Sequence, residues 1–220
     1  MRPTIKDFEN IKGAIFDIDG TILDTMGAWD STGEKLLARF GKVPEENLHK
    51  ILFPLTMEET AKYLIENYEI PLSTDQVVEE INQIMIDFYR DEAQIKNDML
   101  NLIKEFKNAG IPMAVATTTD RDAFMPAFER LGLKPYFDGI FTCSEVGFSK
   151  EYPHIFREAL KVLKTPVECT YVFEDGLFSA VTASKEGLQI VGVYDESSSE
   201  KWEDLKGLSK KYFDQRGDLW

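Results

Sequence analysis

The sequence predicts an α/β fold in which a parallel β-sheet carries helices on both faces and a small helical bundle is attached to it. Short apolar segments alternate with helical segments between residues 98 and 194, which is typical of a parallel sheet. The segment Gly13–Phe16 has only small or apolar residues, as expected of a strand buried on both faces. Between these two parts, residues 26–89 show only helical periodicity.

The first strand ends where polar residues begin. Asp17 follows Phe16 directly, and Gly20 provides a tight turn because glycine adopts backbone angles that other residues avoid. Two carboxylates, those of Asp17 and Asp19, are therefore expected at the carboxyl end of a strand, where open α/β sheets bind their ligands. The pair therefore predicts a site that binds a cation and catalyses a reaction.

A helical segment follows this turn. Gly41 is expected to end its first helix, and capping boxes that begin at Thr56 and Ser73 open its last two helices. The four helices are expected at residues 26–40, 44–52, 56–68 and 73–89. We expect residues 25–94 to form a compact cap, hinged near Asp24 and again near residues 91–95.

The remaining residues, 1–24 and 95–220, are expected to form an α/β core. After the cap, strands are expected at 111–116, 139–142, 169–173 and 189–194, and helices at 98–109, 120–131, 153–163 and 177–186. Regular alternation of this kind predicts a Rossmann-like parallel sheet with helices on both faces.

Composition narrows the classes of partner. The formal net charge of −14 argues against nucleic acid and membrane as partners, because nucleic acids and anionic membranes both require a basic surface. Cys143 and Cys169 lack the spacing of a zinc site and are expected to be small core residues. No apolar run resembles a signal peptide or approaches membrane-spanning length, so we expect a cytoplasmic protein, with a monomer favoured.

The turn after the first strand belongs to a longer pattern, Phe-Asp-x-Asp-Gly-Thr-x-x-Asp-Thr, at residues 16–25. An Asp-Gly turn alone is common in proteins that have no active site. The whole pattern is far more specific, and it resembles the signature of the haloacid dehalogenase-like superfamily. Most members of that family are magnesium-dependent phosphatases and phosphomutases, and one subclass carries a helical cap at this place in the chain.

Two further motifs of that family have counterparts later in the sequence. Thr117, at the end of the second core strand, matches a serine or threonine of the second motif and is followed by Thr118, although a hydroxyl-rich helix N-cap has the same appearance. Lys150 resembles the lysine of the third motif, although a lone lysine is most often a surface charge. Glu151 stands where the family usually has proline, and His154 where it usually has aspartate.

The segment at residues 173–176 resembles the fourth motif, whose usual form is Phe-Glu-Asp-Ser. Glu174 and Asp175 match it, whereas Gly176 replaces the usual serine and Ser179 stands where glycine is frequent. An acidic helix N-cap is the alternative interpretation, and it is compatible with metal binding.

The resemblance implies a role for each matched residue. Asp17 is the expected nucleophile and Asp19 the general acid and base. Mg²⁺ is expected to bind Asp17, the backbone carbonyl of Asp19, and Asp175, while Glu174 acts through water or orients these ligands. The residues expected to hold the phosphoryl oxygens are Thr117, Thr118 and Lys150.

These roles predict the hydrolysis of a small phosphorylated metabolite through an aspartyl phosphate. A sugar-phosphate phosphomutase is the second interpretation, because it uses the same two aspartates. A third is a catalytically silent relative that binds a metabolite or a partner protein through the cap. Asp19 disfavours a dehalogenase, which lacks aspartate there, and receiver domains are much shorter and have no helical insert.

The cap is expected to select the substrate, because the core motifs engage only the phosphoryl group. Phosphomutases of this fold have basic residues in the cap where this chain has Trp29 and the turn at residues 52–56. That turn contains no Arg or Lys, and Phe53 offers apolar surface unless it packs against the cap's own helices. We therefore expect uncharged leaving groups to be preferred. If a doubly anionic substrate is preferred instead, Arg121 is the candidate basic residue.

Overall fold

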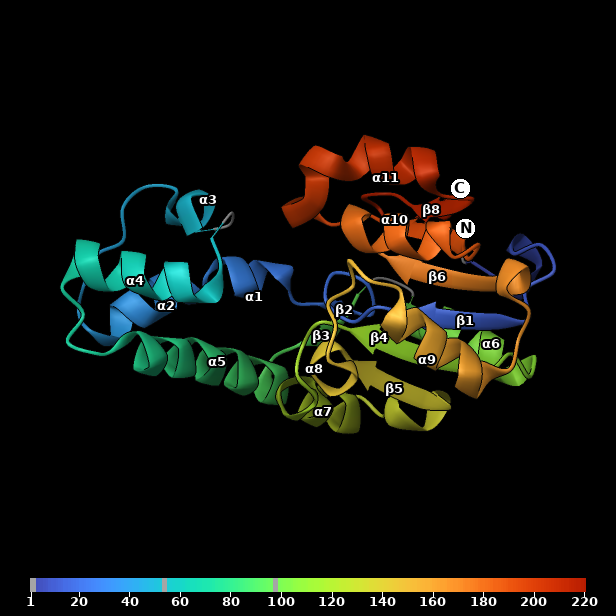
Figure 1. The fold of residues 1–220 in the computed structure, drawn as a ribbon, viewed down its shortest axis with the longest axis horizontal. Helices are drawn as coiled ribbons and strands as arrows, with labels where there is room; N and C mark the ends of the chain where they lie inside the picture. The colour runs from blue at the N-terminus through green and yellow to red at the C-terminus, as the bar shows by residue number, and fades with distance from the viewer. Residues whose placement is uncertain (1–2, 53–54, 97–98) are drawn as a thin grey trace.

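The computed structural model describes residues 3–52, 55–96 and 99–220. Its centre is a six-stranded sheet with the order β5-β4-β1-β6-β7-β8, in which all neighbouring strands are parallel (Figure 1). The strands are β1 Gly13–Phe16, β4 Met113–Thr117, β5 Gly139–Thr142, β6 Thr170–Glu174, β7 Gln189–Val193 and β8 Lys211–Phe213. The Rossmann-like parallel sheet expected from the sequence is therefore confirmed.

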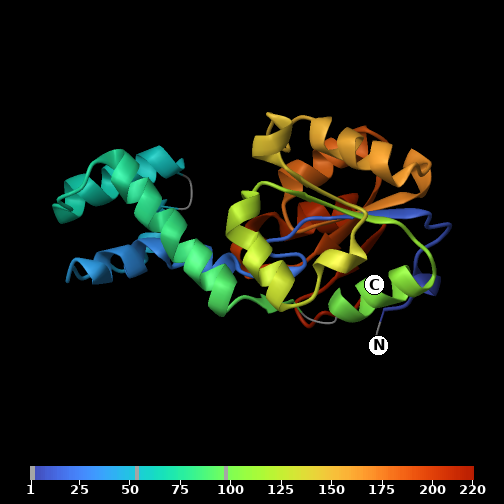
Figure 2. The ribbon, with the colours of Figure 1, turned by 90° about the horizontal axis from the view of Figure 1, so that it is seen from below.

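The side chains of β1 point alternately to the two faces of the sheet, and each face has its own hydrophobic cluster. Ala14 and Phe16 lie in one cluster with α6 and α7, whereas Ile15 lies in the other with α9, α10 and α11. Figure 2 shows these helices on the two sides of the sheet. They are α6 Met99–Asn108, α7 Arg121–Arg130, α9 His154–Leu163, α10 Leu177–Lys185 and α11 Trp202–Leu208.

The segment between β1 and α6 forms a helical unit beyond one end of the sheet (Figures 1 and 2). The predicted capping boxes are present, with the Thr56 N–H donating to Glu59 at 2.8 Å and the Ser73 N–H donating to Gln76 at 2.9 Å. A third hydrophobic cluster joins α2, α4 and α5. The helices of the unit are α1 Met26–Asp30, α2 Thr32–Arg39, α3 Leu48–Leu52, α4 Met57–Tyr68 and α5 Thr74–Asp91.

Two predicted helices of this unit have the wrong bounds. The helix expected at 26–40 is divided at Ser31, whose hydroxyl donates to the carbonyl of Ala28 at 2.9 Å. The helix expected at 44–52 is limited to α3, because Asn47 takes a left-handed backbone angle with φ of 62°. Local hydrogen bonding and backbone geometry therefore overrode the helical periodicity.

Several short elements were not predicted. β2 Leu23–Asp24 and β3 Gln94–Ile95 pair antiparallel at the two ends of the helical unit. Also unpredicted were α8 Cys143–Val146, and α11 and β8 near the end of the chain. Both cysteines, expected in the core, are only half-buried. No helix among the described residues has the length and apolar character needed to cross a bilayer.

The division of the chain into a core and a cap stays a prediction. Two residues of α5, Met85 and Tyr89, are buried in the same cluster as α6 and α7. Arg130 of α7 donates hydrogen bonds to the backbone carbonyls of Tyr89 at 3.2 Å and Ala93 at 2.6 Å. The end of α5 is thus attached to the core through packing and hydrogen bonds as well as through the chain.

Candidate active site

Three parallel strands bring the predicted site residues to one edge of the sheet. β1 lies between β4 and β6, so the carboxyl ends of the three strands meet. Asp17 follows β1, Thr117 ends β4, and Asp175 follows β6. The backbone N–H of Asp17 donates to the carbonyl of Phe173 at 3.0 Å, which extends the sheet bonding into the site.

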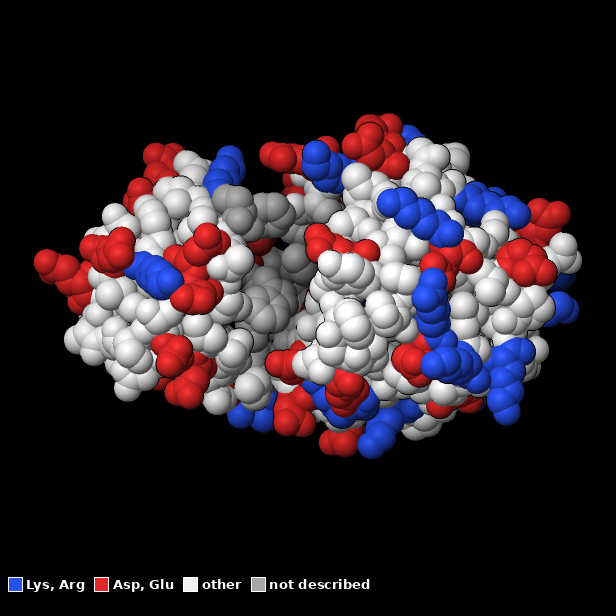
Figure 3. Space-filling view, viewed as in Figure 1, with Lys and Arg blue, Asp and Glu red and all other residues white. Residues whose placement is uncertain are grey.

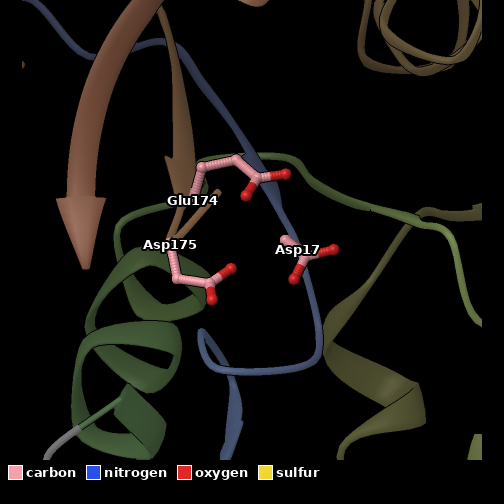
Figure 4. Close-up of side chains that lie close together, drawn as sticks. All are labelled: Asp17, Glu174 and Asp175. Atoms are coloured by element: carbon pink, nitrogen blue, oxygen red, sulfur yellow. The ribbon is translucent and has the colours of Figure 1, made fainter. Parts of the chain in front are cut away.

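A cluster of carboxylates occupies this edge. The side chains of Asp17, Glu174 and Asp175 lie close together (Figure 4). One ligand oxygen from each lies within 4.8 Å of those of the other two. The ammonium of Lys150, only 2% exposed, forms ion pairs with Asp17 and, at 2.6 Å, with Glu174. The ammonium of Lys150 therefore pairs with two of the three buried carboxylates.

The excess of negative charge changes the ionisation of the cluster. Burial raises the pKa of Asp17 to about 8, although the attraction of Lys150 opposes this rise. Burial also raises the pKa of Asp175 well above its ordinary value, and the charge of Glu174 adds to the rise. Burial opposes the charge on Lys150, but attraction by Asp17 and Glu174 prevails and raises its pKa. Full ionisation of the carboxylates thus calls for a further cation.

The donor set fits a hard divalent cation. Such ions prefer carboxylate oxygens, and one oxygen from each of the three side chains lies within reach of a single ion. The set includes Asp17 and Asp175, which are two of the predicted ligands. The side chain of Asp19 does not belong to it, and the prediction for Asp19 concerns its backbone carbonyl.

The turn after β1 requires glycine at position 20. Gly20 has a left-handed φ of 75°, and a Cβ at this position would collide with the carboxylate of Asp175. The Gly20 carbonyl accepts a hydrogen bond from Nζ of Lys96 at 2.7 Å, and Lys96 also forms a buried ion pair with Asp195. No sequence motif marks this ion pair, because neither residue belongs to one and they are 99 positions apart.

The carboxylate of Glu174 accepts several hydrogen bonds. Besides Lys150, it accepts a bond from the N–H of Gly176 at 3.0 Å and one from the buried hydroxyl of Ser179. The two residues that depart from the fourth family motif, Gly176 and Ser179, therefore both donate hydrogen bonds to Glu174. The role of Glu174 in orienting other groups stays a prediction. Glu151, another departure from the family motifs, is exposed, and Lys150 pairs with Asp17 and Glu174 instead.

The carboxylate of Asp19 accepts hydrogen bonds from three hydroxyl groups. Thr25 donates to Oδ1 at 2.6 Å, Tyr89 also donates to Oδ1, and Thr119 donates to Oδ2 at 2.6 Å. Burial and the charge of Asp19 raise the pKa of Tyr89 well above its ordinary value, so the phenol stays protonated. Tyr89 and Thr119 were not predicted as site residues. The run of threonines after β4 is a signal for Thr119, whereas nothing in the sequence marks Tyr89.

The two predicted phosphate-binding threonines differ in environment. Thr117 is buried, and its hydroxyl oxygen accepts a hydrogen bond from the backbone N–H of Thr119 at 3.1 Å. Thr118 is exposed and lines the same cavity as Lys150. Their contact with a phosphoryl group stays a prediction.

Two adjoining cavities lie between the helical unit and this edge of the sheet. Their volumes are about 860 Å³ and about 1160 Å³, and Asp19, His49 and Thr118 line both. The larger cavity contains Asp17 and Lys150. Figure 3 shows the surface hollowed between the two parts of the molecule. The arrangement provides room for a small ligand beside Asp17 and Asp19.

Two of the predicted specificity residues, Trp29 and Arg121, line the smaller cavity. The indole N–H of Trp29 donates to the hydroxyl oxygen of Tyr89 at 3.2 Å. The guanidinium of Arg121 is bound by Glu145, with one N–H donating at 2.8 Å, so its charge is already paired. The third residue, Phe53, lies outside the described residues.

Comparison with known proteins identifies similar chains. A family model described as haloacid dehalogenase-like hydrolase matches residues 14–193. A Saccharomyces cerevisiae protein named as a probable pseudouridine-5'-phosphatase is 30% identical over 83% of this chain and 82% of its own length. A phosphorylated carbohydrates phosphatase of Thermotoga maritima is 27% identical over 83% and 85%, respectively. The structure of CbbY (mutant D10N) from Rhodobacter sphaeroides in complex with xylulose-(1,5)bisphosphate superimposes with a TM-score of 0.76 at 22% identity, covering 94% of this chain and 96% of that one.

Proposed function

The chain belongs to the haloacid dehalogenase-like hydrolase family, and from this premise we propose that it is a Mg²⁺-dependent phosphatase of small phosphorylated metabolites that uses Asp17 as its nucleophile. One observation carries the proposal most directly. Asp17 lies in the carboxylate cluster beside the buried ammonium of Lys150 and lines a cavity large enough for a metabolite. The relatives named as phosphatases support the same reaction.

The proposed reaction has two steps. A carboxylate oxygen of Asp17 attacks phosphorus, the bond to the leaving oxygen breaks, and Asp19 gives a proton to that oxygen. Water then attacks the phosphorus of the aspartyl phosphate, Asp19 takes a proton from the water, and Asp17 is released as a carboxylate. The net change is one phosphomonoester and one water converted into one alcohol and one phosphate.

Charge stabilisation is assigned to the residues around the nucleophile. Lys150, which pairs with Asp17, is proposed to neutralise both that carboxylate and the oxygens of the phosphoryl group. Thr117 and Thr118 are proposed to donate hydrogen bonds to those oxygens. Mg²⁺ would be held by Asp17, Asp175 and the backbone carbonyl of Asp19, where it would balance the negative charge of the carboxylates and the substrate.

Activity should depend on this ion. With Mg²⁺, the protein should release inorganic phosphate from at least one member of a panel of sugar and nucleoside monophosphates. EDTA should abolish the release and added Mg²⁺ should restore it, whereas Ca²⁺ should not, because its larger and looser ligand shell misplaces the reacting groups. Phosphate release measured by a colorimetric assay tests this. Full activity in EDTA would remove the metal from the mechanism, and an isomerised phosphate ester without phosphate release would indicate a mutase.

The leaving group is proposed to carry no second anionic group. The smaller cavity, where Asp19 lies, is lined by apolar and acidic side chains together with hydroxyl groups, His49 and Asn82, and its arginine is already paired with Glu145. The apolar residues are Met26, Trp29, Leu52, Leu55, Met57, Met85, Ile86 and Ala123, and the acidic residues are Asp19, Asp30, Asp120, Asp122 and Glu145. A second phosphate would meet repulsion from these carboxylates, and Arg121, the one arginine among the described lining residues, is already paired.

We expect kcat/KM for a sugar monophosphate to exceed that for the corresponding bisphosphate by about tenfold or more. Glu145→Gln should narrow this ratio, because it leaves the charge of Arg121 unpaired at the cavity wall. Glu129→Gln, which changes an exposed carboxylate that lines neither cavity, is the matched control. A preference for the bisphosphate that Glu145→Gln does not alter would show that another basic residue recognises the leaving group.

A further inference from the structure

We propose that Tyr89 of α5 is a positioning residue that holds the carboxylate of Asp19 for proton transfer, so that the helical unit completes the catalytic site. The inference rests on the proposed function, because it takes Asp19 as the group that exchanges a proton with the leaving group. Tyr89 lies outside all four sequence motifs, and it is 70 positions from Asp19 in the chain.

The hydrogen bonds around Tyr89 have a defined direction. The indole N–H of Trp29 can only donate, so the hydroxyl oxygen of Tyr89 is the acceptor at 3.2 Å. The single hydroxyl hydrogen of Tyr89 is then available to Oδ1 of Asp19, which it contacts. Trp29 therefore orients Tyr89, and Tyr89 orients Asp19.

The two oxygens of Asp19 differ in how they are held. Oδ1 accepts hydrogen bonds from Tyr89 and Thr25, both of which are fully buried. Oδ2 accepts its bond from Thr119, which is half-buried and lines the smaller cavity. Oδ2 is therefore the oxygen that can exchange the hydroxyl of Thr119 for the oxygen of the leaving group, while Oδ1 stays fixed.

Tyr89 is itself held in place by the core. Its ring is buried in the cluster that includes α6 and α7. Its backbone carbonyl accepts a hydrogen bond from Arg130 of α7 at 3.2 Å. A buried ring with a fixed backbone leaves its hydroxyl little freedom, so Asp19 receives this bond only when α5 packs against α7.

A positioning role predicts an effect that depends on the leaving group. A simple alkyl phosphate needs a proton on its leaving oxygen, whereas p-nitrophenolate leaves as a stable anion and needs none. Loss of the Tyr89 hydroxyl should therefore reduce kcat/KM for the alkyl phosphate far more than for p-nitrophenyl phosphate. The ratio kcat/KM is the appropriate quantity, because it excludes the later hydrolysis of the aspartyl phosphate.

The test is Tyr89→Phe, which removes only the hydroxyl and keeps the buried ring. We expect kcat/KM for the alkyl phosphate to fall by about tenfold or more, since general acid catalysis contributes about 10²-fold to 10⁴-fold in all. The value for p-nitrophenyl phosphate should fall by less than about twofold. Trp29→Phe removes the donor to Tyr89. It should also reduce kcat/KM for the alkyl phosphate more than for p-nitrophenyl phosphate, but by a smaller factor than Tyr89→Phe does.

Tyr63→Phe is the matched control. Tyr63 is also in the helical unit and donates its hydroxyl to a carboxylate, that of Glu45, but the residue lines neither cavity. Tyr63→Phe should leave kcat/KM for both substrates unchanged.

If Tyr89→Phe lowered kcat/KM equally for both substrates, Tyr89 would have a structural role only. If kcat/KM were unchanged for both, Tyr89 would have no role. Either result overturns the inference. Failure of the proposed function is distinct, because the wild-type protein would then release no phosphate from any substrate, and the inference would fall with it.

Discussion

Asp17→Asn is expected to reduce kcat by at least about 10³-fold, because an amide cannot act as the nucleophile at phosphorus. The substitution keeps the shape of the side chain and removes one of the three clustered carboxylates, two of which pair with Lys150. In EDTA, the variant should therefore unfold at the same temperature as the wild type or at a higher one, since burial already disfavours the charged form of Asp17. Steady-state kinetics and thermal unfolding measure the two effects separately.

Asp122→Asn is the matched control for this experiment. Asp122 is exposed on the wall of the smaller cavity and does not belong to the carboxylate cluster. Its substitution should leave turnover of p-nitrophenyl phosphate close to that of the wild type. Activity of Asp17→Asn within about tenfold of the wild type, with mass spectrometry showing no deamidation, would remove Asp17 from the nucleophilic role.

Lys150→Met should have the largest effect on stability. Removing one partner of a buried ion pair leaves uncompensated charge, which typically costs about 3–5 kcal/mol of unfolding free energy. Here the loss would leave the buried carboxylates of Asp17 and Glu174 without their ammonium. Denaturant unfolding in EDTA should show this loss, and Mg²⁺ should recover part of it by supplying positive charge. Turnover should also fall, by about 10²-fold or more, because the phosphoryl oxygens lose their cation.

Lys161→Met provides the comparison. The side chain of Lys161 is 69% exposed and pairs with Glu158 on the surface of α9, where an ion pair contributes little. The unfolding free energy of this variant should match that of the wild type. If Lys150→Met were equally stable in EDTA, the ammonium would not be needed to balance the cluster, and the interpretation of the site's charge would be wrong.

The sequence by itself determined the sheet and the place of the cluster at its edge. The apolar run of β1, the turn at Gly20 and the capping boxes at Thr56 and Ser73 each depend on residues within a few positions of one another. Alternation of strands and helices then required a parallel sheet, and the carboxyl ends of parallel strands meet at one edge. Asp17 and Asp175 could therefore be expected together from their positions after two strands.

The tertiary structure decided which side chains support these residues. The hydrogen bonds of Asp19 to Tyr89 and Thr119 span 70 and 100 positions, and the ion pair of Lys96 with Asp195 spans 99. Such contacts depend on how whole helices pack, which periodicity does not specify. The short pair β2 and β3 was missed for the same reason, because two-residue strands exist only through their partner.

At the cavity, too, the sequence shows where a residue lies, whereas only the packing of distant elements shows what it contacts. The sequence shows that Arg121 follows the second core strand, but only the folded chain brings it to Glu145 and pairs its charge. It shows a serine at position 179, but only the packing of α10 beside β6 gives its hydroxyl to Glu174. Local interactions determine at which strand end or turn each reactive group lies. Long-range packing determines which side chains contact that group, and hence its charge and orientation.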